Sequence, residues 1–214
     1  MAANEPSTAP APASLRRLRL ALVAAVVVLI VAVVALVLLH RGSSDAVPAS
    51  SNVAATWAPG EKAAPGFRLT DEHGRPVSMA GLRGRRVIVT FVDPHCTTFC
   101  PRESIVLNDA IRTLPAAERP AIVAVSVDPK TRSLAVLRHE ARRFKWLPQW
   151  RWAVGSDAQL RSVWGAYHIE VVPTPGDIAH TEAAYLVDAH GDQRALLLWP
   201  FKAADVASAL ERLR

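Results

Sequence analysis

The chain has 214 residues, of which 50% are hydrophobic, and a formal net charge of +6 at pH 7. So apolar a composition excludes a disordered tail and fits one folded domain with an appendage. In a cytosolic protein, the positive charge alone would make nucleic acid a candidate partner. The apolar segment near the start of the chain argues against that class of partner.

Residues 20–39 are all Ala, Val, Leu or Ile. A helix of about 20 apolar residues spans the hydrocarbon core of a bilayer, about 30 Å thick. The alternative is a cleaved signal peptide, whose apolar core runs only about 7–15 residues. The length of the run therefore predicts one N-terminal transmembrane helix that is retained as an anchor.

Basic residues are distributed unequally around this run. Three precede it and one follows closely: Arg16, Arg17, Arg19 and Arg41. Positive charge stays on the cytoplasmic side, so residues 1–19 are expected inside the cell and the rest of the chain outside the cytoplasm. This predicts a single-pass protein of the cell membrane with an extracytoplasmic functional domain, out of reach of nucleic acid.

Residues 40–61 are rich in Ser, Ala and Pro without an apolar period, which predicts a linker. The folded domain is expected over residues 62–214. It opens with a short alternating segment, residues 67–77, that turns at His73-Gly74 and predicts a hairpin. Residues 86–92 and 121–127 are nearly continuous β-branched apolar runs, typical of strands buried on both faces.

Helical and strand patterns then alternate along the chain. Pro101 suits the first turn of a helix that ends before Pro115. Further helices are expected at 133–144, 158–167 and 202–213, and further strands at 152–154, 183–187 and 195–199, with a proline-containing loop before 183. This order predicts an α/β fold, a thioredoxin-like mixed sheet flanked by helices.

The two cysteines of the chain, Cys96 and Cys100, lie between the first buried strand and the helix after it. A helix N-terminus favours thiolate over thiol. A structural disulfide, a thiol-disulfide exchange site and a metal site are all compatible with this pair. A disulfide closing so short a loop restricts the unfolded chain little. Two thiolates select Cu(I), zinc or an iron-sulfur cluster, but they cannot alone complete a tetrahedral site, whereas Cu(I) accepts three ligands.

A third ligand would come from the seven histidines. Most of them are interpreted as solvated residues, in turns, beside the apolar run or on a helix. His95 adjoins Cys96 and is an alternative ligand or a residue that supports one. The residues alone favour a surface position for His180, in a proline-rich loop.

Three motifs carry a resemblance to a known family. The run His95-Cys96-Thr97-Thr98-Phe99-Cys100-Pro101 resembles the His-Cys-x-x-x-Cys-Pro motif of the SCO/SenC copper-binding proteins of cytochrome c oxidase assembly. Residues 180–191 resemble the family's His-Ser/Thr, then Tyr-Leu-x-Asp-x-x-Gly segment, and residues 126–129 its Ser-Val-Asp-Pro. The resemblance extends over about residues 62–214.

This resemblance implies a copper ion bound by the thiolates of Cys96 and Cys100 and the imidazole of His180. The chain departs from the family at Thr97, where Pro is common, and at Asp93-Pro94, where Gly-x-Thr is common. These departures bear on loop conformation, copper affinity and redox potential more than on ligand identity.

The function implied is that of a membrane-anchored copper metallochaperone. It would bind Cu(I) or Cu(II) and deliver it to the CuA-bearing subunit of cytochrome c oxidase, with a thiol reductant and a copper donor as further partners. The alternative is an extracytoplasmic thiol-disulfide oxidoreductase that needs Cys96 and Cys100 but not His180. Peroxide reduction is disfavoured, because the chain lacks the usual Pro-x-x-x-Thr/Ser-x-x-Cys loop.

Overall fold

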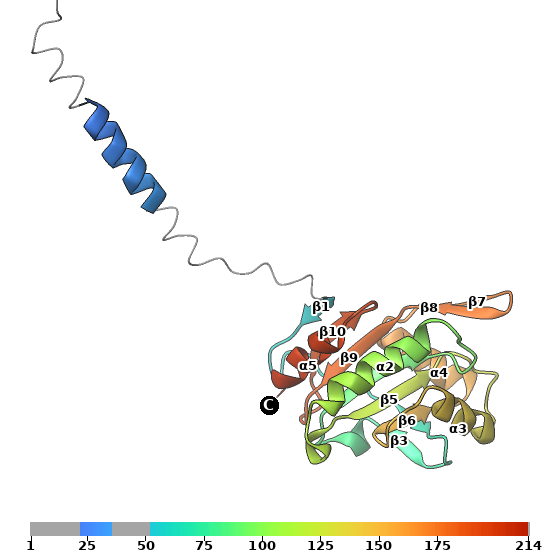
Figure 1. Cartoon of the computed structure of the whole chain (residues 1–214). Helices are drawn as coiled ribbons and strands as arrows, with labels where there is room; N and C mark the ends of the chain where they lie inside the picture. Colours follow the sequence, from blue (N-terminus) through green and yellow to red (C-terminus); the bar gives the residue numbers. More distant parts are fainter. Residues whose placement is uncertain (1–21, 36–51, 214) are drawn as a thin grey trace, which may run out of the picture. The chain divides into compact units, whose positions relative to one another are not determined.

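The computed structural model describes residues 22–35 and 52–213. The chain divides into two compact units, Met1–Ser50 and Ser51–Arg214. In the first, residues 22–35 form an exposed helix (Figure 1). Within the described ranges, none of the helices reaches the length and apolarity that a membrane crossing needs. The cytoplasmic segment expected at 1–19, both ends of the expected anchor and most of the expected linker lie outside the described residues.

The second unit is built on a six-stranded mixed sheet with the strand order β1-β10-β9-β4-β5-β6. The strands are β1 (Val53–Thr56), β4 (Val87–Val92), β5 (Ala121–Ser126), β6 (Trp150–Ala153), β9 (Ala183–Val187) and β10 (Gln193–Leu198). β4, β5 and β6 run parallel, and β9 pairs antiparallel with β4. Every residue of β4 and β5 is buried, as their continuous apolar sequences predict.

Helices cover both faces of the sheet. Helices α2 (Phe99–Arg112), α3 (Leu134–Arg143) and α5 (Ala203–Glu211) pack against one face. Helix α4 (Asp157–Ala166) and the hairpin of β2 (Arg68–Thr70) and β3 (Pro76–Ser78) pack against the other. Short 3-10 turns lie at Ala80–Leu82 and Ala116–Glu118.

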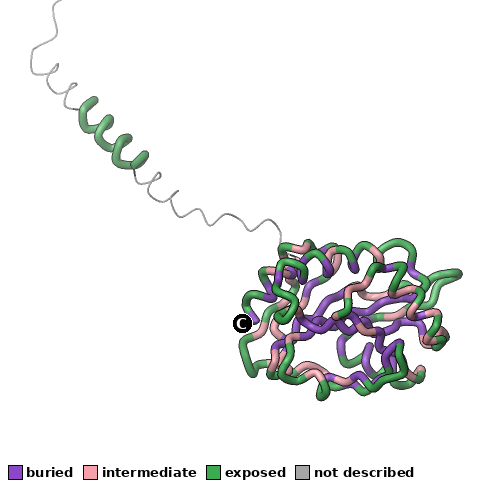
Figure 2. Tube along the Cα trace, turned by 60° about the horizontal axis from the view of Figure 1, so that its bottom comes forward, coloured by how far each residue is buried: buried purple, intermediate pink, exposed green. Residues whose placement is uncertain are grey.

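The two faces carry separate hydrophobic cores because side chains alternate along each strand. In β4, Ile88 and Val92 face the α2 side, whereas Val89 and Phe91 face the α4 side. The central strands are accordingly buried while the outer surfaces of the covering elements are exposed (Figure 2). The α/β fold with a mixed sheet and flanking helices is therefore confirmed.

Two features differ from the expectations. Strand β1 pairs with β10, with Val53 opposite Leu197, so the fold begins before residue 62 and includes part of the expected linker. Its four residues are too few to show a period. The proline-containing loop is in fact a hairpin of β7 (Val171–Thr174) and β8 (Asp177–His180), which forms a separate two-stranded sheet. Proline is tolerated at such edges, which lack a neighbouring strand on one side.

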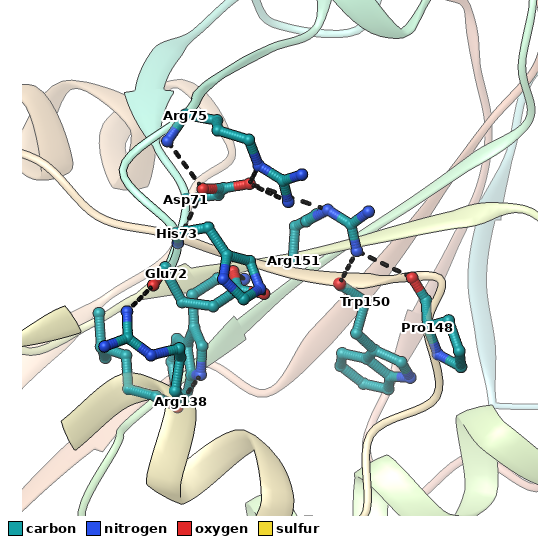
Figure 3. A network of polar contacts seen from close by, with 10 residues as sticks. Asp71, Glu72, His73, Arg75, Arg138, Pro148, Trp150 and Arg151 are labelled. Atoms are coloured by element: carbon teal, nitrogen blue, oxygen red, sulfur yellow. Dashed lines mark hydrogen bonds and ion pairs between the residues drawn. The ribbon is translucent and has the colours of Figure 1, made fainter. Parts of the chain in front are cut away.

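The β2–β3 hairpin is fastened to the sheet by the polar contacts in Figure 3. The carboxylate of Asp71 accepts the backbone N–H groups of His73 and Arg75, both at 2.9 Å, which fixes the turn. Glu72 accepts the backbone N–H of Trp152 in β6 at 2.9 Å, and its carbonyl accepts the guanidinium of Arg138 in α3 at 2.8 Å. These bonds tie the turn to both a strand and a helix.

Candidate metal centre

The cysteines lie at the carboxyl edge of the parallel strands, between the end of β4 and the first turn of α2. Asp93 stabilises the turn of this loop: its Oδ1 accepts the N–H of His95 at 2.9 Å, and its carbonyl accepts the N–H of Cys96 at 3.2 Å. From α3, the guanidinium of Arg143 donates to the carbonyls of Pro94 and Cys96. The loop that carries Cys96 is thus held from both sides.

Cys96 precedes α2, whereas Cys100 lies in its first turn. The two cysteines are therefore joined by a contact between the loop and the first turn of the helix, and they do not share a helix face. The backbone N–H of Cys100 donates to Sγ of Cys96 at 3.3 Å, while Thr98 at the N-cap position makes no side-chain cap bond. The sulfur takes the place of a capping oxygen at the positive end of the helix.

The two thiols differ in acidity because one donates to the other. The hydrogen bond from the Cys100 side chain, aided by the backbone N–H groups of Cys100 and Thr98 and opposed by burial, lowers the pKa of Cys96 to about 5. Donation of that hydrogen bond and burial raise the pKa of Cys100. Both cysteines are free. At neutral pH the pair is thus a thiolate and a thiol that share one proton.

His180 ends β8 and reaches the cysteines across the sheet edge. A ring nitrogen of His180, Sγ of Cys100 and a carboxylate oxygen of Glu182 all lie within 4.8 Å of one another. Nδ1 of His180 lies 3.1 Å from the carbonyl of Thr181. A carbonyl only accepts, so Nδ1 carries the hydrogen and Nε2 keeps its lone pair for a metal.

Of the predicted ligands, the structure brings Cys100 and His180 into one cluster. Cys96 is in hydrogen-bond contact with Cys100 and lines a cavity together with His180 and Glu182, but it is outside the three-residue cluster. Glu182 was not predicted. A single acidic residue just before an apolar strand looks like an ordinary strand boundary, and no motif pointed to it.

His95 is outside this cluster. Its Nε2 lies 2.8 Å from Oγ1 of Thr131, which donates to Asp128 at 2.6 Å. His95 thus joins the loop that follows β5. The other described histidines lie elsewhere: His73 in the β2–β3 turn, His139 on α3, His168 after α4 and His190 in the β9–β10 turn; His40 lies outside the described residues.

A buried carboxyl group lies on α2, one helical turn after Cys100. Glu103 on α2 is 1% exposed. Oγ1 of Thr90 in β4 lies 2.5 Å from Glu103 and 3.1 Å from the carbonyl of Ala183. The hydroxyl has one hydrogen, and the carbonyl has none to offer, so a protonated Glu103 that donates to Thr90 satisfies all three groups. Burial raises the pKa of Glu103 to about 8; the hydrogen bond that Thr90 can donate to the ionised carboxylate opposes this shift, and the nearby charges of Glu182 and Cys96 add to it.

An open cavity of about 470 Å³ gives access to the cluster. Its lining includes Asp93, Cys96, Phe99, His180, Glu182 and Trp199. Two large apolar side chains at this cavity stand exposed, Phe99 at 46% and Leu198 at 40%. Burial and the negative charge of Cys96 raise the pKa of Glu182 to about 7. The site combines soft sulfur donors, an imidazole and a carboxylate behind a partly apolar mouth.

The fold and site define a thioredoxin-like domain with a cysteine pair at the carboxyl edge of its parallel strands. The structure resembles the thioredoxin domain of a thiol-disulfide oxidoreductase from Bacteroides vulgatus, with a TM-score of 0.54 and 21% identity over 74% of this chain and 96% of that one. It also resembles Bradyrhizobium japonicum ScoI solved with copper bound, with a TM-score of 0.58 and 25% identity over 71% of this chain and 99% of that one.

The family is shown by the sequence. A family model described as SCO1/SenC matches residues 56–214, and the chain belongs to this family. It is 28% identical over 134 residues to mouse "Protein SCO2 homolog, mitochondrial", covering 58% of this chain and 52% of that protein. It is 34% identical over 110 residues to a Mycobacterium tuberculosis protein named as a peroxiredoxin, covering 51% and 64%. The chain thus spans about half to two thirds of these curated relatives.

Proposed function

We propose that the chain is a copper carrier that binds Cu(I) through Cys96, Cys100 and His180. The observation that carries this proposal is the convergence of the His180 ring on the Cys100 sulfur, from an element remote in the sequence. Membership of the SCO1/SenC family and the copper bound to the related ScoI support it. Two thiolates and an imidazole are a donor set that suits Cu(I).

Loading releases a proton. Cys96 is already a thiolate, whereas Cys100 holds the proton that the pair shares. A Cu(I) ion that takes both sulfurs displaces this proton to solvent, and the ion then provides the positive charge that stabilises both thiolates. An oxidised Cys96–Cys100 pair has no thiolates to offer, so reduction by a partner thiol protein precedes loading.

Delivery is proposed to the CuA-bearing subunit of cytochrome c oxidase, by ligand exchange. Three ligands leave a Cu(I) ion accessible through the cavity, so that a recipient sulfur or imidazole binds before a donor ligand leaves. The exposed side chains of Phe99 and Leu198 at the cavity offer an apolar contact to a protein partner. The apolar run at residues 20–39 supports a location at the cell membrane with this domain outside the cytoplasm.

The test is a Cu(I) titration of the reduced full chain under argon, in mild detergent, against a chromogenic chelator. The parent should bind about one equivalent, and His180→Ala should weaken binding by about 10-fold or more, since one of three ligands is lost. His139→Ala, which removes an exposed histidine on α3, is the matched control and should bind as the parent does. Equal affinity of the parent and His180→Ala would refute the carrier.

A second function, thiol-disulfide exchange, is favoured by the unequal thiols. The Cys96 thiolate would attack a substrate disulfide, form a mixed disulfide and expel one substrate thiolate. Cys100, giving up its proton, would then attack the Cys96 sulfur and release the second thiolate, leaving Cys96 and Cys100 oxidised. Full reduction of a small aromatic disulfide by His180→Ala, together with undiminished Cu(I) binding, would favour this function over the carrier.

A further inference from the structure

The carboxyl group of Glu182 is held in place by the backbone around it. Glu182 stands between β8 and β9. The N–H of the preceding Thr181 donates to the carbonyl of Glu170 at 2.9 Å, and the carbonyl of Glu182 accepts the N–H of Trp199 at 3.0 Å. The backbone is therefore held on both sides of Glu182, and the side chain lines the cavity that Cys96 and His180 also line.

One oxygen of this carboxyl group lacks a protein partner. Oε2 of Glu182 is buried and makes no hydrogen bond among the described residues. By contrast, Asp71 and Asp188 accept several backbone N–H groups in their turns. Burying a polar oxygen without a partner is unfavourable. The cluster with Cys100 and His180 places this carboxylate where a cation would satisfy it.

The donor set that results has one member more than Cu(I) requires. Two sulfurs and an imidazole satisfy a soft monovalent ion, whereas a carboxylate oxygen is a hard ligand that divalent ions accept. Two sulfurs, one nitrogen and one oxygen complete four-coordination for a borderline divalent ion. The three negative charges of such a set are also better balanced by a divalent ion than by a monovalent one.

We propose that Glu182 is a fourth ligand that the site uses for divalent ions, Cu(II) among them, and not for Cu(I). This inference rests on the proposed role of Cys96, Cys100 and His180. It adds a residue that selects between the oxidation states of the cargo: the carboxylate binds when the ion is divalent and leaves the three-ligand set when the ion is monovalent.

Co(II) is the probe for the test because it does not oxidise thiols, and its visible bands are intense in four-coordinate and weak in six-coordinate sites. The reduced full chain, in mild detergent, is titrated with Co(II) and separately with Cu(I). Glu182→Gln keeps the shape of the side chain and removes its charge. Asp177→Asn is the matched control, since Asp177 lines the same cavity but is outside the cluster.

We expect the parent to bind one Co(II) with intense bands and sulfur-to-metal charge transfer. Glu182→Gln should lose about 10–100-fold in Co(II) affinity and show altered bands, as loss of a ligand requires, with Cu(I) affinity within about 3-fold of the parent. Asp177→Asn should match the parent for both ions. The unchanged Cu(I) binding of Glu182→Gln also shows that the variant is folded.

Two results would overturn this inference alone: a parent that binds Cu(I) but not Co(II), or a Glu182→Gln variant with the Co(II) affinity and spectrum of the parent. Failure of the parent to bind Cu(I) would instead refute the carrier function. An equal loss of Co(II) affinity in Asp177→Asn would assign the effect to the charge of the cavity and would also count against a ligand role for Glu182.

Discussion

The protonation state of Glu103, one helical turn after Cys100, can be tested through its effect on stability. In the folded chain it is buried and bonded to Thr90. Glu103→Gln replaces the acid by a group of the same shape that cannot ionise. The amide N–H₂ of Gln donates to Thr90 as the protonated acid does, and Thr90 still donates to the carbonyl of Ala183. The variant thus fixes the neutral state that the parent must hold by keeping a proton.

The size of the effect follows from linkage. The pKa of Glu103 is about 8 in the folded chain against an ordinary value of 4.5. Because the folded pKa is raised, the contribution to stability is fully present below pH 4.5 and is lost as pH rises towards 8. At about 1.4 kcal/mol per pH unit, the parent loses about 3 kcal/mol between pH 4.5 and pH 7 through this group, and Glu103→Gln does not.

The assay is urea denaturation of the reduced chain at several pH values from 4.5 to 8. Other groups titrate in this range, so the quantity to compare is the difference in unfolding free energy between variant and parent. This difference should move by about 3 kcal/mol in favour of Glu103→Gln between pH 4.5 and pH 7. Glu211→Gln, an exposed position on α5, should show a constant difference. Parallel pH profiles of Glu103→Gln and parent would refute a neutral Glu103.

Three further outcomes test the site and its support. Iodoacetamide should alkylate Cys96 before Cys100 in the reduced chain, with a half-maximal rate near pH 5 by mass spectrometry, and Cys100→Ala should raise that midpoint by removing the donor. Arg143→Ala should lower the free energy of unfolding by about 1–2 kcal/mol, because two carbonyls of the Cys96 loop lose their donor; a urea midpoint identical to that of the parent would contradict this. Ser156→Ala, which removes the capping box of α4, should lower the free energy of unfolding by about 1 kcal/mol in a thermal melt. Ser156→Asp should keep most of that stabilisation, because Asp is also a good N-cap residue.

The central elements were predictable because their sequence patterns are strong. The runs around β4 and β5 are apolar at almost every position, which only a strand covered on both faces requires. The β7–β8 hairpin was not predictable, since Pro173 indicates a loop and the pairing of Val171 with His180 depends on residues that show no period.

The site was predictable only in part. The position of Cys96 and Cys100 between a strand and a helix indicated thiol chemistry from the residues alone. His180 entered through the family resemblance, because no local pattern shows that a residue of one hairpin meets a helix far from it in the sequence. Glu182 was missed for the same reason, and its proximity to Cys100 is visible only after folding.

The hairpin that carries His180 is a sheet of its own. Cys100 belongs to α2 and Cys96 to the loop before it, so a shared ion would act as a cross-brace between parts that backbone pairing leaves separate. Unloading would take that brace away. Under the proposed function, the metal-bound and metal-free forms would then differ in stiffness at the rim of the cavity, so a protein partner would meet two different surfaces before any ligand is exchanged.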